Sequence, residues 1–220
     1  LMTITYHSGK RLQGISTGHT TAGTPYDASD SNLAYAEGHD FSSHSTNSIG
    51  MASSPDGTHF YISEEGGGIH QFDLSTAWDV STAVWQREYT HGLTNPKGIF
   101  FKSDGTYMYL ASFNTATVYR YPLNTAWDLS TVQSSDQSLS TASNQDLFIS
   151  SDGTKLFVSD NSGNVSKWNL GTAWTINSNT STDGSYSGAG IGIGAVTFSA
   201  DGTKMFLGGW NSSGYIKQYA

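Results

Sequence analysis

A repeated glycine turn is the feature of this sequence that most restricts what the chain can fold into. Four segments carry an Asp-Gly-Thr turn followed by an alternating apolar run: SPDGTHFYIS, KSDGTYMYLA, SSDGTKLFVS and SADGTKMFLG. Their glycines, Gly57, Gly105, Gly153 and Gly202, are spaced by 48, 48 and 49 residues. A weaker copy, YHSGKRLQGIS, places Gly9 another 48 residues before Gly57. Five units of one period therefore account for the chain.

Each unit predicts four short antiparallel strands. The third unit reads KGIFFKS, the turn Asp104-Gly105-Thr106, YMYLASF, TVYRYPL, a tryptophan-centred phrase and a weaker TVQSSDQSL. Asp-Gly between two apolar runs is a strong hairpin signal, because glycine accepts the positive φ of a tight turn. Four strands in a period of roughly 40 to 50 residues are typical of a propeller blade. We predict an all-β, five-bladed β-propeller with four-stranded antiparallel blades.

The predicted propeller is a single domain, residues 1–220, with repeats at approximately 1–46, 47–94, 95–143, 144–190 and 191–220. The last blade is predicted to be incomplete, because YIKQYA corresponds to its third strand. Three ways of closing the ring stay open: packing of the first blade on the last, a longer polypeptide, or an edge from a neighbouring molecule. We expect a monomer in which the edge at Tyr215 to Tyr219 can contact another chain.

The tryptophan phrase recurs as FDLSTAWDVSTAV, YPLNTAWDLSTVQ and WNLGTAWTINSNT. It falls between the third and fourth strands in three units, so Trp78, Trp127 and Trp174 should have one structural role, covering a blade edge or the seam with the next blade. The alternative is stacking of each ring on a sugar. Repetition in register favours the structural role.

At these residues the sequence resembles the blades of TolB-like propellers, which share the S-x-D-G-T turn. The full unit, SPDGT followed by FDLSTAWDVSTA, resembles repeats in proteins of phages and environmental viruses, some attached to tail or fibre components. The resemblance covers essentially the whole chain and implies a propeller of viral or environmental-microbial origin. It does not imply one function, because propellers host enzymes, lectins and docking platforms.

Composition narrows the class of partner. The chain is 36% hydrophobic, 13% aromatic and 13% charged, with a net charge of -8 and no cluster of basic residues. Such a balance repels a phosphate backbone, so nucleic acid is not expected as a partner. No apolar run approaches a membrane span and the start of the chain lacks the apolar core of a signal peptide, so we expect a soluble protein without membrane contact. The absence of cysteine fits any compartment, virion-associated and extracellular ones included.

Positions that differ between the five copies are the better place to look for a site. The loops between the second and third strands differ most: STGHTTAG, EEGGG, SFNTA, DNSGN and GWNSSG. The connections between blades also vary and should lie on the same face, near the axis. The candidate ligand-binding residues there are Glu64, Glu65, Phe113, Asn114, Asp146, Asp160, Asn161 and Trp210. Carboxylates, amides and rings of this kind suit a ligand rich in hydroxyl groups.

A structural explanation competes at most of these positions. Asn, Asp and Gly are also the residues that turns require, so a single loop Asn is more often a turn former than a ligand contact. Glutamate is a poor turn former, which makes Glu64 and Glu65 better candidates; the alternative for this pair is a solvated acidic loop.

These observations favour a non-catalytic recognition or structural module that binds glycan or protein on its variable face. One alternative is a glycoside hydrolase, which needs two facing carboxylates; Asp146 with Glu64 or Asp160 would have to supply them. The other is a purely structural virion component. No cofactor or metal is expected: DNSGN lacks the later glutamate of a calcium loop, and the seven histidines show no zinc-binding spacing.

Overall fold

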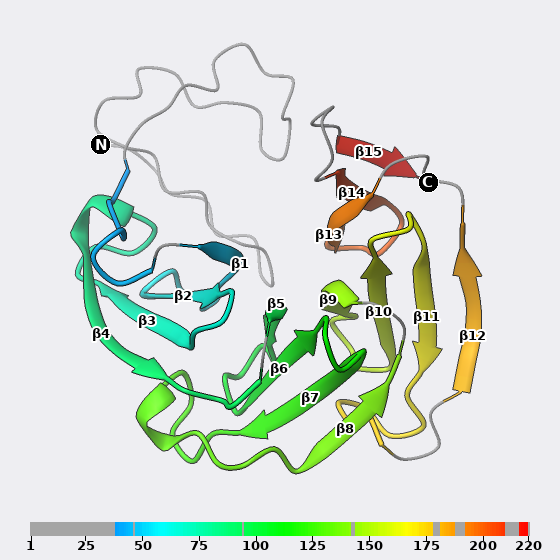
Figure 1. The fold of residues 1–220 in the computed structure, drawn as a ribbon, viewed down its shortest axis with the longest axis horizontal. Coiled ribbons are helices and arrows are strands. Elements are labelled where there is room, and N and C mark those ends of the chain that lie inside the picture. The colour runs from blue at the N-terminus through cyan, green and yellow to red at the C-terminus, as the bar shows by residue number, and fades with distance from the viewer. Residues whose placement is uncertain are drawn as a thin grey trace.

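The structure is a computed structural model, which describes residues 38–45, 47–93, 95–141, 144–177, 181–187, 192–209 and 216–219. These residues form four antiparallel sheets, each a meander of consecutive strands. Figure 1 shows the sheets around a common centre, with β1, β5, β9 and β13 innermost and β4, β8 and β12 at the rim. The chain is thus an all-β propeller.

Three of the sheets have four strands and one has three. The β1–β4 sheet holds β1 (Ser48–Ser53), β2 (His59–Glu64), β3 (Ile69–Leu74) and β4 (Ala83–Tyr89). The β5–β8 sheet holds β5 (Pro96–Phe101), β6 (Tyr107–Ser112), β7 (Thr117–Pro122) and β8 (Gln137–Ser140). The β9–β12 sheet holds β9 (Asn144–Ile149), β10 (Lys155–Asp160), β11 (Val165–Asn169) and β12 (Ser181–Tyr186). The β13–β15 sheet holds β13 (Ile193–Phe198), β14 (Met205–Gly209) and β15 (Ile216–Tyr219).

The described residues thus show four blades where five are predicted. The predicted first blade, residues 1–46, falls almost wholly outside the described residues, so the number five stays a prediction. The last blade has three strands in the described part of the chain, as the sequence predicts. Two short 3-10 helices, η1 (Val80–Thr82) and η2 (Leu129–Thr131), follow Trp78 and Trp127 and are not predicted by the repeat pattern.

The Asp-Gly-Thr turn explains why every first hairpin forms. The glycines have positive φ, +73°, +74°, +72° and +71° at Gly57, Gly105, Gly153 and Gly202. In each turn the Asp carboxylate accepts a hydrogen bond from the Thr backbone N–H two residues later, 3.0 Å in the case of Asp152 and Thr154. Hydrogen bonds from the Ser150 hydroxyl and from Thr154 lower the pKa of Asp152 to about 2. The motif is therefore a self-contained turn that needs no other part of the chain.

The tryptophans cover these turns. All three adopt left-handed backbone conformations, with φ of 66°, 66° and 65° at Trp78, Trp127 and Trp174. The ring of Trp127 lies so close over Gly105 that an added Cβ would meet its Nε1 at 2.4 Å. The rings of the other two lie in the same way over the turns of their own blades. Only a glycine leaves room for the ring at this position.

The same loops also bind the preceding blade. The Tyr61 hydroxyl, on β2, donates a hydrogen bond to the Trp127 carbonyl, and the Tyr109 hydroxyl, on β6, donates one of 2.7 Å to the Trp174 carbonyl. These contacts agree with the predicted structural role of the tryptophans at the seams between blades.

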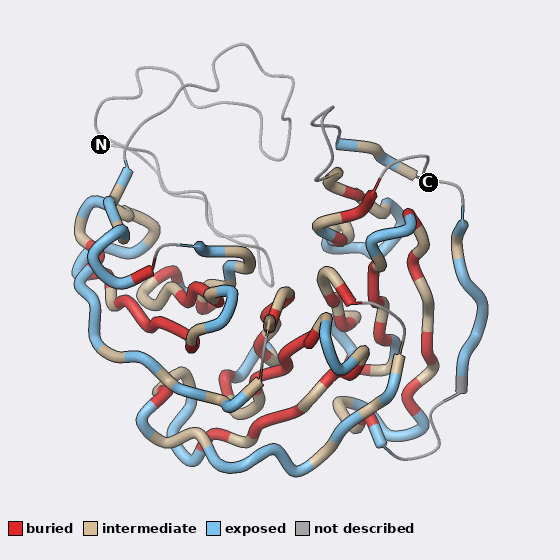
Figure 2. The backbone as a smooth tube through the Cα atoms, viewed as in Figure 1, coloured by how far each residue is buried: buried red, intermediate tan, exposed pale blue. Residues whose placement is uncertain are grey.

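Among the described residues, three of the four hydrophobic clusters lie between two sheets. One cluster joins Tyr109 and Val118 of the β5–β8 sheet to Leu147 and Leu156 of the β9–β12 sheet. A second lies in the preceding seam and a third in the following one. Figure 2 shows the buried residues concentrated along the inner and middle strands, with exposed residues along the outer edges. Each sheet thus depends on its neighbours for burial of its faces.

Candidate functional site

The three described variable loops follow β2, β6 and β10, the second strands of their blades, so they emerge at one end of the molecule. Equivalent strands of neighbouring blades run in the same direction, which puts Glu64 and Asp160, the last residues of β2 and β10, at that common end. Backbone hydrogen bonds join these loops to the connections that precede the inner strands: Glu65 N–H to the Asn47 carbonyl at 3.0 Å and Phe113 N–H to the Asn95 carbonyl at 3.2 Å. We call this end the loop face.

Glu65 lies where two blades meet on the loop face. Its Oε2 accepts a hydrogen bond of 2.7 Å from the Asn47 amide, and its Oε1 lies 3.5 Å from the Lys97 ammonium group on β5 of the next blade. The Glu65 side chain keeps 39% of its surface exposed, whereas that of Lys97 keeps 16%. The result is a polar cluster across a seam, with donors and acceptors that remain open to solvent.

Glu64 points to a different neighbour. Its Oε2 lies 3.3 Å from Nε2 of the buried His70, whose Nδ1 accepts a 3.4 Å hydrogen bond from the Trp85 ring. The two adjacent glutamates therefore have different surroundings: Glu64 packs against its own blade, and Glu65 spans the seam. That both glutamates bind a ligand stays a prediction.

Asp160 stabilises its own loop. Its Oδ1 accepts hydrogen bonds from the backbone N–H groups of Ser162 and Asn164 at 2.8 and 2.9 Å, and its Oδ2 accepts one from the Asn164 amide at 2.9 Å. For this residue the turn-forming explanation is the better one, because the carboxylate is engaged by the loop it begins. Asn161, the next residue, is exposed.

The remaining predicted residues differ in accessibility. Phe113 is half-buried and Asn114 is exposed at the equivalent loop of the β5–β8 sheet. Trp210 lies outside the described residues. Of the predicted set, Glu65, Phe113, Asn114 and Asn161 therefore present accessible side chains on the loop face.

Asp146 is positioned by the inner strands. It lies on β9, and its Oδ2 accepts a hydrogen bond of 2.9 Å from the Val196 N–H on β13 of the next blade. On its other side the β5 strand approaches so closely that a Cβ on Gly98 would meet Oδ1 at 2.6 Å. Burial raises the pKa of the Asp146 carboxyl to about 7, against hydrogen bonds from Val196 and Leu147 that lower it. Asp146 is only partly buried, so water reaches part of the residue although protein atoms surround its carboxyl group.

This geometry bears on the glycosidase alternative. A carboxyl with a pKa near 7 has the protonation of a general acid, but catalysis also needs a second carboxylate free to face it. Asp160 is engaged by its own loop and Glu64 lies against His70. The arrangement favours a structural role for Asp146, joining two inner strands.

Sequence reasoning did not identify several polar groups near the loop face. Lys97 is the main example. The sequence could have indicated it, because the equivalent positions of the other described blades hold uncharged residues, Ile49, Gln145 and Gly194. Within the described residues, buried polar atoms without a hydrogen-bond partner include His91 Nε2, Asn95 Oδ1, Ser112 Oγ and Ser159 Oγ. Burial lowers the pKa of His91 to about 4.

Two hollows of the described surface lie away from the predicted residues. The larger, of about 410 Å³, is lined by the β9–β12 and β13–β15 sheets, and the other lies beside β8. No group of three or more His, Asp or Glu that could hold a metal occurs in the part of the chain that the structure describes. Among the same residues, no helix has the length and apolar character needed to span a bilayer.

Comparison with known proteins supports the fold. No family model and no curated protein matches the chain. A functionally unknown protein from Desulfotomaculum acetoxidans matches with a TM-score of 0.56 and 21% identity, over 79% of this chain and 55% of its own. The periplasmic gluconolactonase of Pseudomonas aeruginosa matches with a TM-score of 0.55 and 16% identity, over 74% and 50%. The Swd1 β-propeller domain of Myceliophteria thermophila matches with a TM-score of 0.52 and 13% identity, over 77% and 55%.

At these identities the likeness concerns the fold alone, and the chain spans about half the length of the proteins it matches. The resemblance to TolB-like and phage repeats has no support from a family model. What structure and comparisons establish together is that this chain has a β-propeller fold.

Proposed function

We propose that the chain is a non-catalytic recognition module of a five-bladed propeller, binding a hydroxyl-rich glycan or a protein on the loop face. The observation that carries this proposal is the cluster at the first described seam, where Glu65, Asn47 and Lys97 meet and the Glu65 carboxylate stays open to solvent. Carboxylate, amide and ammonium groups held by one another present fixed acceptors and donors to a ligand, which lowers the entropy cost of binding. Phe113 and Asn114 extend the surface on the next loop.

A glycan array tests the proposal. The parent protein, Glu65→Gln and Phe113→Ala are compared with Asn124→Ala, a control at an exposed position of a tryptophan loop, at the opposite end of the strands. We expect the control to match the parent and the two loop-face variants to lose at least fivefold in signal. Equal signals for all four proteins, or no bound glycan and no bound protein partner, would count against the proposal.

The second candidate is a glycan- or sugar-lactone-cleaving enzyme. It is favoured by the pKa of Asp146, about 7, and by the name of the gluconolactonase that shares the fold. Incubation with polysaccharides and aldonolactones between pH 4 and 8, followed by reducing-end or acid-release assays, decides it. Activity that disappears in Asp146→Asn while the fold is retained would support the enzyme over the binding module.

Origin and assembly belong to the same proposal. The S-x-D-G-T and T-A-W-D units support a phage or environmental-virus source with a virion-associated or extracellular location. A monomer that presents the β15 edge to other chains is expected, without nucleic acid or membrane partners. Size-exclusion chromatography with light scattering measures the oligomeric state. A stable dimer would contradict the expected monomer.

A further inference from the structure

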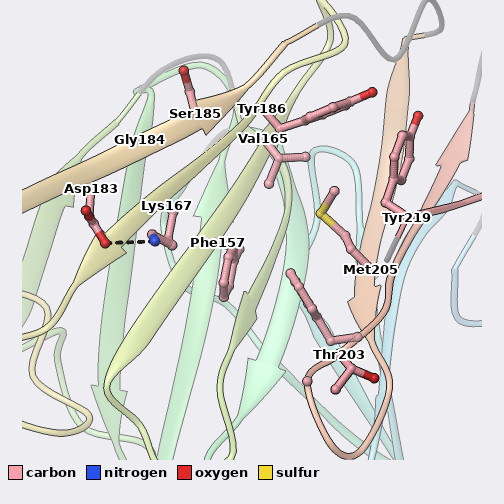
Figure 3. Close-up of a pocket in the computed structure, with 12 residues that line it drawn as sticks. Phe157, Val165, Lys167, Asp183, Gly184, Ser185, Tyr186, Thr203, Met205 and Tyr219 are labelled. Atoms are coloured by element: carbon pink, nitrogen blue, oxygen red, sulfur yellow. Dashed lines mark ion pairs between the residues drawn. The ribbon is translucent and has the colours of Figure 1, made fainter.

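The seam between the β9–β12 and β13–β15 sheets contains the larger hollow, of about 410 Å³. Figure 3 shows Phe157 and Lys167 on one wall and Met205 on the other. The charged groups that line this hollow neutralise each other, because Lys167 Nζ lies 2.7 Å from Asp183 Oδ2. The inner end of the same seam differs, because the Asp146 carboxyl lies there without a charged partner among the described residues.

Asp146 stands at a position where the other described blades have small residues. The equivalent residues of β1, β5 and β13 are Gly50, Gly98 and Ala195. The first seam shows the reason for a small residue, because a Cβ at Gly50 would meet the Lys97 carbonyl at 2.4 Å. A carboxyl side chain is therefore present where the inner strands of neighbouring blades approach each other.

Backbone donors hold this carboxyl. Asp146 Oδ2 accepts the hydrogen bond of 2.9 Å from the Val196 N–H, and the Leu147 N–H is a second donor. Burial and these two donors affect its pKa, and no charged side chain of the described residues does. The Lys97 ammonium group, on the neighbouring β5, lies 3.5 Å from the Glu65 carboxylate instead. A carboxylate surrounded by protein without a counter-charge is costly, and a bound cation removes much of that cost.

A buried hydroxyl without a partner accompanies the carboxyl. Ser159 lies opposite Asp146 in the β9–β10 ladder, so the two side chains are on the same face of the sheet. Ser159 is 0% exposed, and its Oγ has no hydrogen-bond partner. The equivalent Ser63 is as deeply buried, but its Oγ accepts from the Gly50 N–H at 2.9 Å and donates to the Lys97 carbonyl at 3.0 Å. The later seam thus has an oxygen available beside the carboxylate.

The next blade supplies a third oxygen to this place. Gly194 of β13 is the residue equivalent to Lys97, whose carbonyl crosses the first seam to Ser63. Carboxylate, hydroxyl and carbonyl oxygens are ligands of hard cations, and water completes their coordination. Water has access, because Asp146 is partly exposed. One negative charge is balanced by one positive charge, which favours a monovalent ion over a divalent one.

We propose that the oxygens of Asp146, Ser159 and Gly194 bind a sodium ion at the inner end of this seam, joining β9 and β10 to β13. Ser159 thereby gains the cross-seam partner that Ser63 has in the first seam. The site is separate from the Glu65 cluster that carries the proposed function, so the two can be tested independently. Because a bound cation lowers the pKa of a carboxyl, the pH dependence of Asp146 refers to sodium-free buffer.

Thermal unfolding of the whole chain in two chloride salts at pH 8 tests the proposal. Sodium chloride at about 0.2 M is compared with tetramethylammonium chloride at the same ionic strength, whose cation is too large to lie between strands. A Kd of about 10 mM would raise the Tm of the parent in sodium chloride by roughly 4 to 7 °C. Asp146→Asn should have the same Tm in both salts, within about 1 °C.

The serines provide a matched pair of variants. Ser159→Ala should lose about half of the sodium-dependent rise, since one ligand is removed. It should still fold, because Ala111 occupies the equivalent position in β6. Ser63→Ala, which removes a hydroxyl at the same position of another blade, should keep the full rise whatever its own Tm.

Several results would overturn the proposal. They are an equal Tm of the parent in both salts, an undiminished sodium response in Asp146→Asn, and equal losses in Ser159→Ala and Ser63→Ala. A larger rise in calcium chloride than in sodium chloride at equal ionic strength would show that the assignment to a monovalent ion is wrong. Sodium NMR gives a readout that does not depend on stability: the parent should broaden the sodium resonance more than Asp146→Asn does, and equal linewidths would also contradict binding at this carboxyl.

Discussion

The buried carboxyl of Asp146 makes a quantitative prediction about stability. Its pKa in the folded protein is about 7, raised by burial from an ordinary value of 3.8. Between these two pH values the folded state keeps a proton that the unfolded state has released. The free energy of unfolding therefore falls as pH rises through this interval, and the loss is complete above pH 7.

The size of the effect follows from the pKa difference. Each pKa unit corresponds to about 1.4 kcal/mol, so the full difference amounts to about 4 kcal/mol between pH 4 and pH 8. Because Asp146 keeps some exposure to solvent, water stabilises part of its charge, and we expect about 2 to 4 kcal/mol. Asp146→Asn removes the charge while its side-chain oxygen can still accept the hydrogen bond from Val196. The variant should thus be more stable than the parent at pH 8 by about this amount.

Urea unfolding of parent and variant at half-unit steps from pH 4 to pH 8 measures this difference. Using the difference removes the contribution of every other titrating group, His91 included. Coincident circular dichroism and fluorescence transitions must first establish two-state unfolding. A difference that stays constant within about 0.5 kcal/mol over the whole range would refute the reasoning, because it would mean that Asp146 has the same pKa in the folded and unfolded states. Carboxyl-carbon NMR titration of Asp146 checks the pKa directly.

Three further changes test the seams and the buried histidine. Gly105→Ala should lower the free energy of unfolding by about 3 kcal/mol in urea titrations, since the new Cβ meets the Trp127 ring; Gly66→Ala, with a similar φ and open space, should cost only about 1 kcal/mol. Tyr109→Phe should cost about 1 kcal/mol by the same measurement, because Arg120 still donates to the same carbonyl. The parent should lose up to about 3 kcal/mol of unfolding free energy as pH falls from 6.5 to 4, because His91 stays neutral in the folded protein while the unfolded chain takes up a proton. His91→Gln should not show this loss. Parallel Tm–pH curves for parent and variant would contradict the prediction.

The strands of the blades could be predicted from the sequence because the interactions that form each hairpin involve residues close together in the chain. Asp104-Gly105-Thr106 forms its turn from hydrogen bonds within the turn, and apolar alternation on either side places the hairpin. The two short 3-10 turns after the tryptophans were not foreseen, because their caps, such as Asp79, look like ordinary loop residues in sequence.

The surroundings of the site residues could not be predicted in the same way, because they depend on contacts between units. Glu64 and Glu65 are neighbours in sequence, yet one lies against His70 of its own blade and the other against Lys97 of the next. Asp146 lies on the inner strand β9, and its hydrogen bond to Val196 crosses a seam that no local pattern describes. Only Asp160, whose partners lie within four residues, had a role that its sequence context could indicate.

The seams also change how differences between copies should be interpreted. Gln71, Arg120 and Lys167 occupy one register position and differ in charge, which by itself suggests a ligand site. Yet Gln71 and Arg120 each hydrogen-bond a tryptophan loop of the next blade, Gln71 as acceptor and Arg120 as donor. Their difference in charge is therefore explained by contacts between blades. A difference between copies therefore indicates a ligand only where no neighbouring blade accounts for it. On the loop face the ion pair with Lys97 explains part of the environment of Glu65. The exposed side chains of Asn114 and Asn161 are the next positions to substitute in a binding assay.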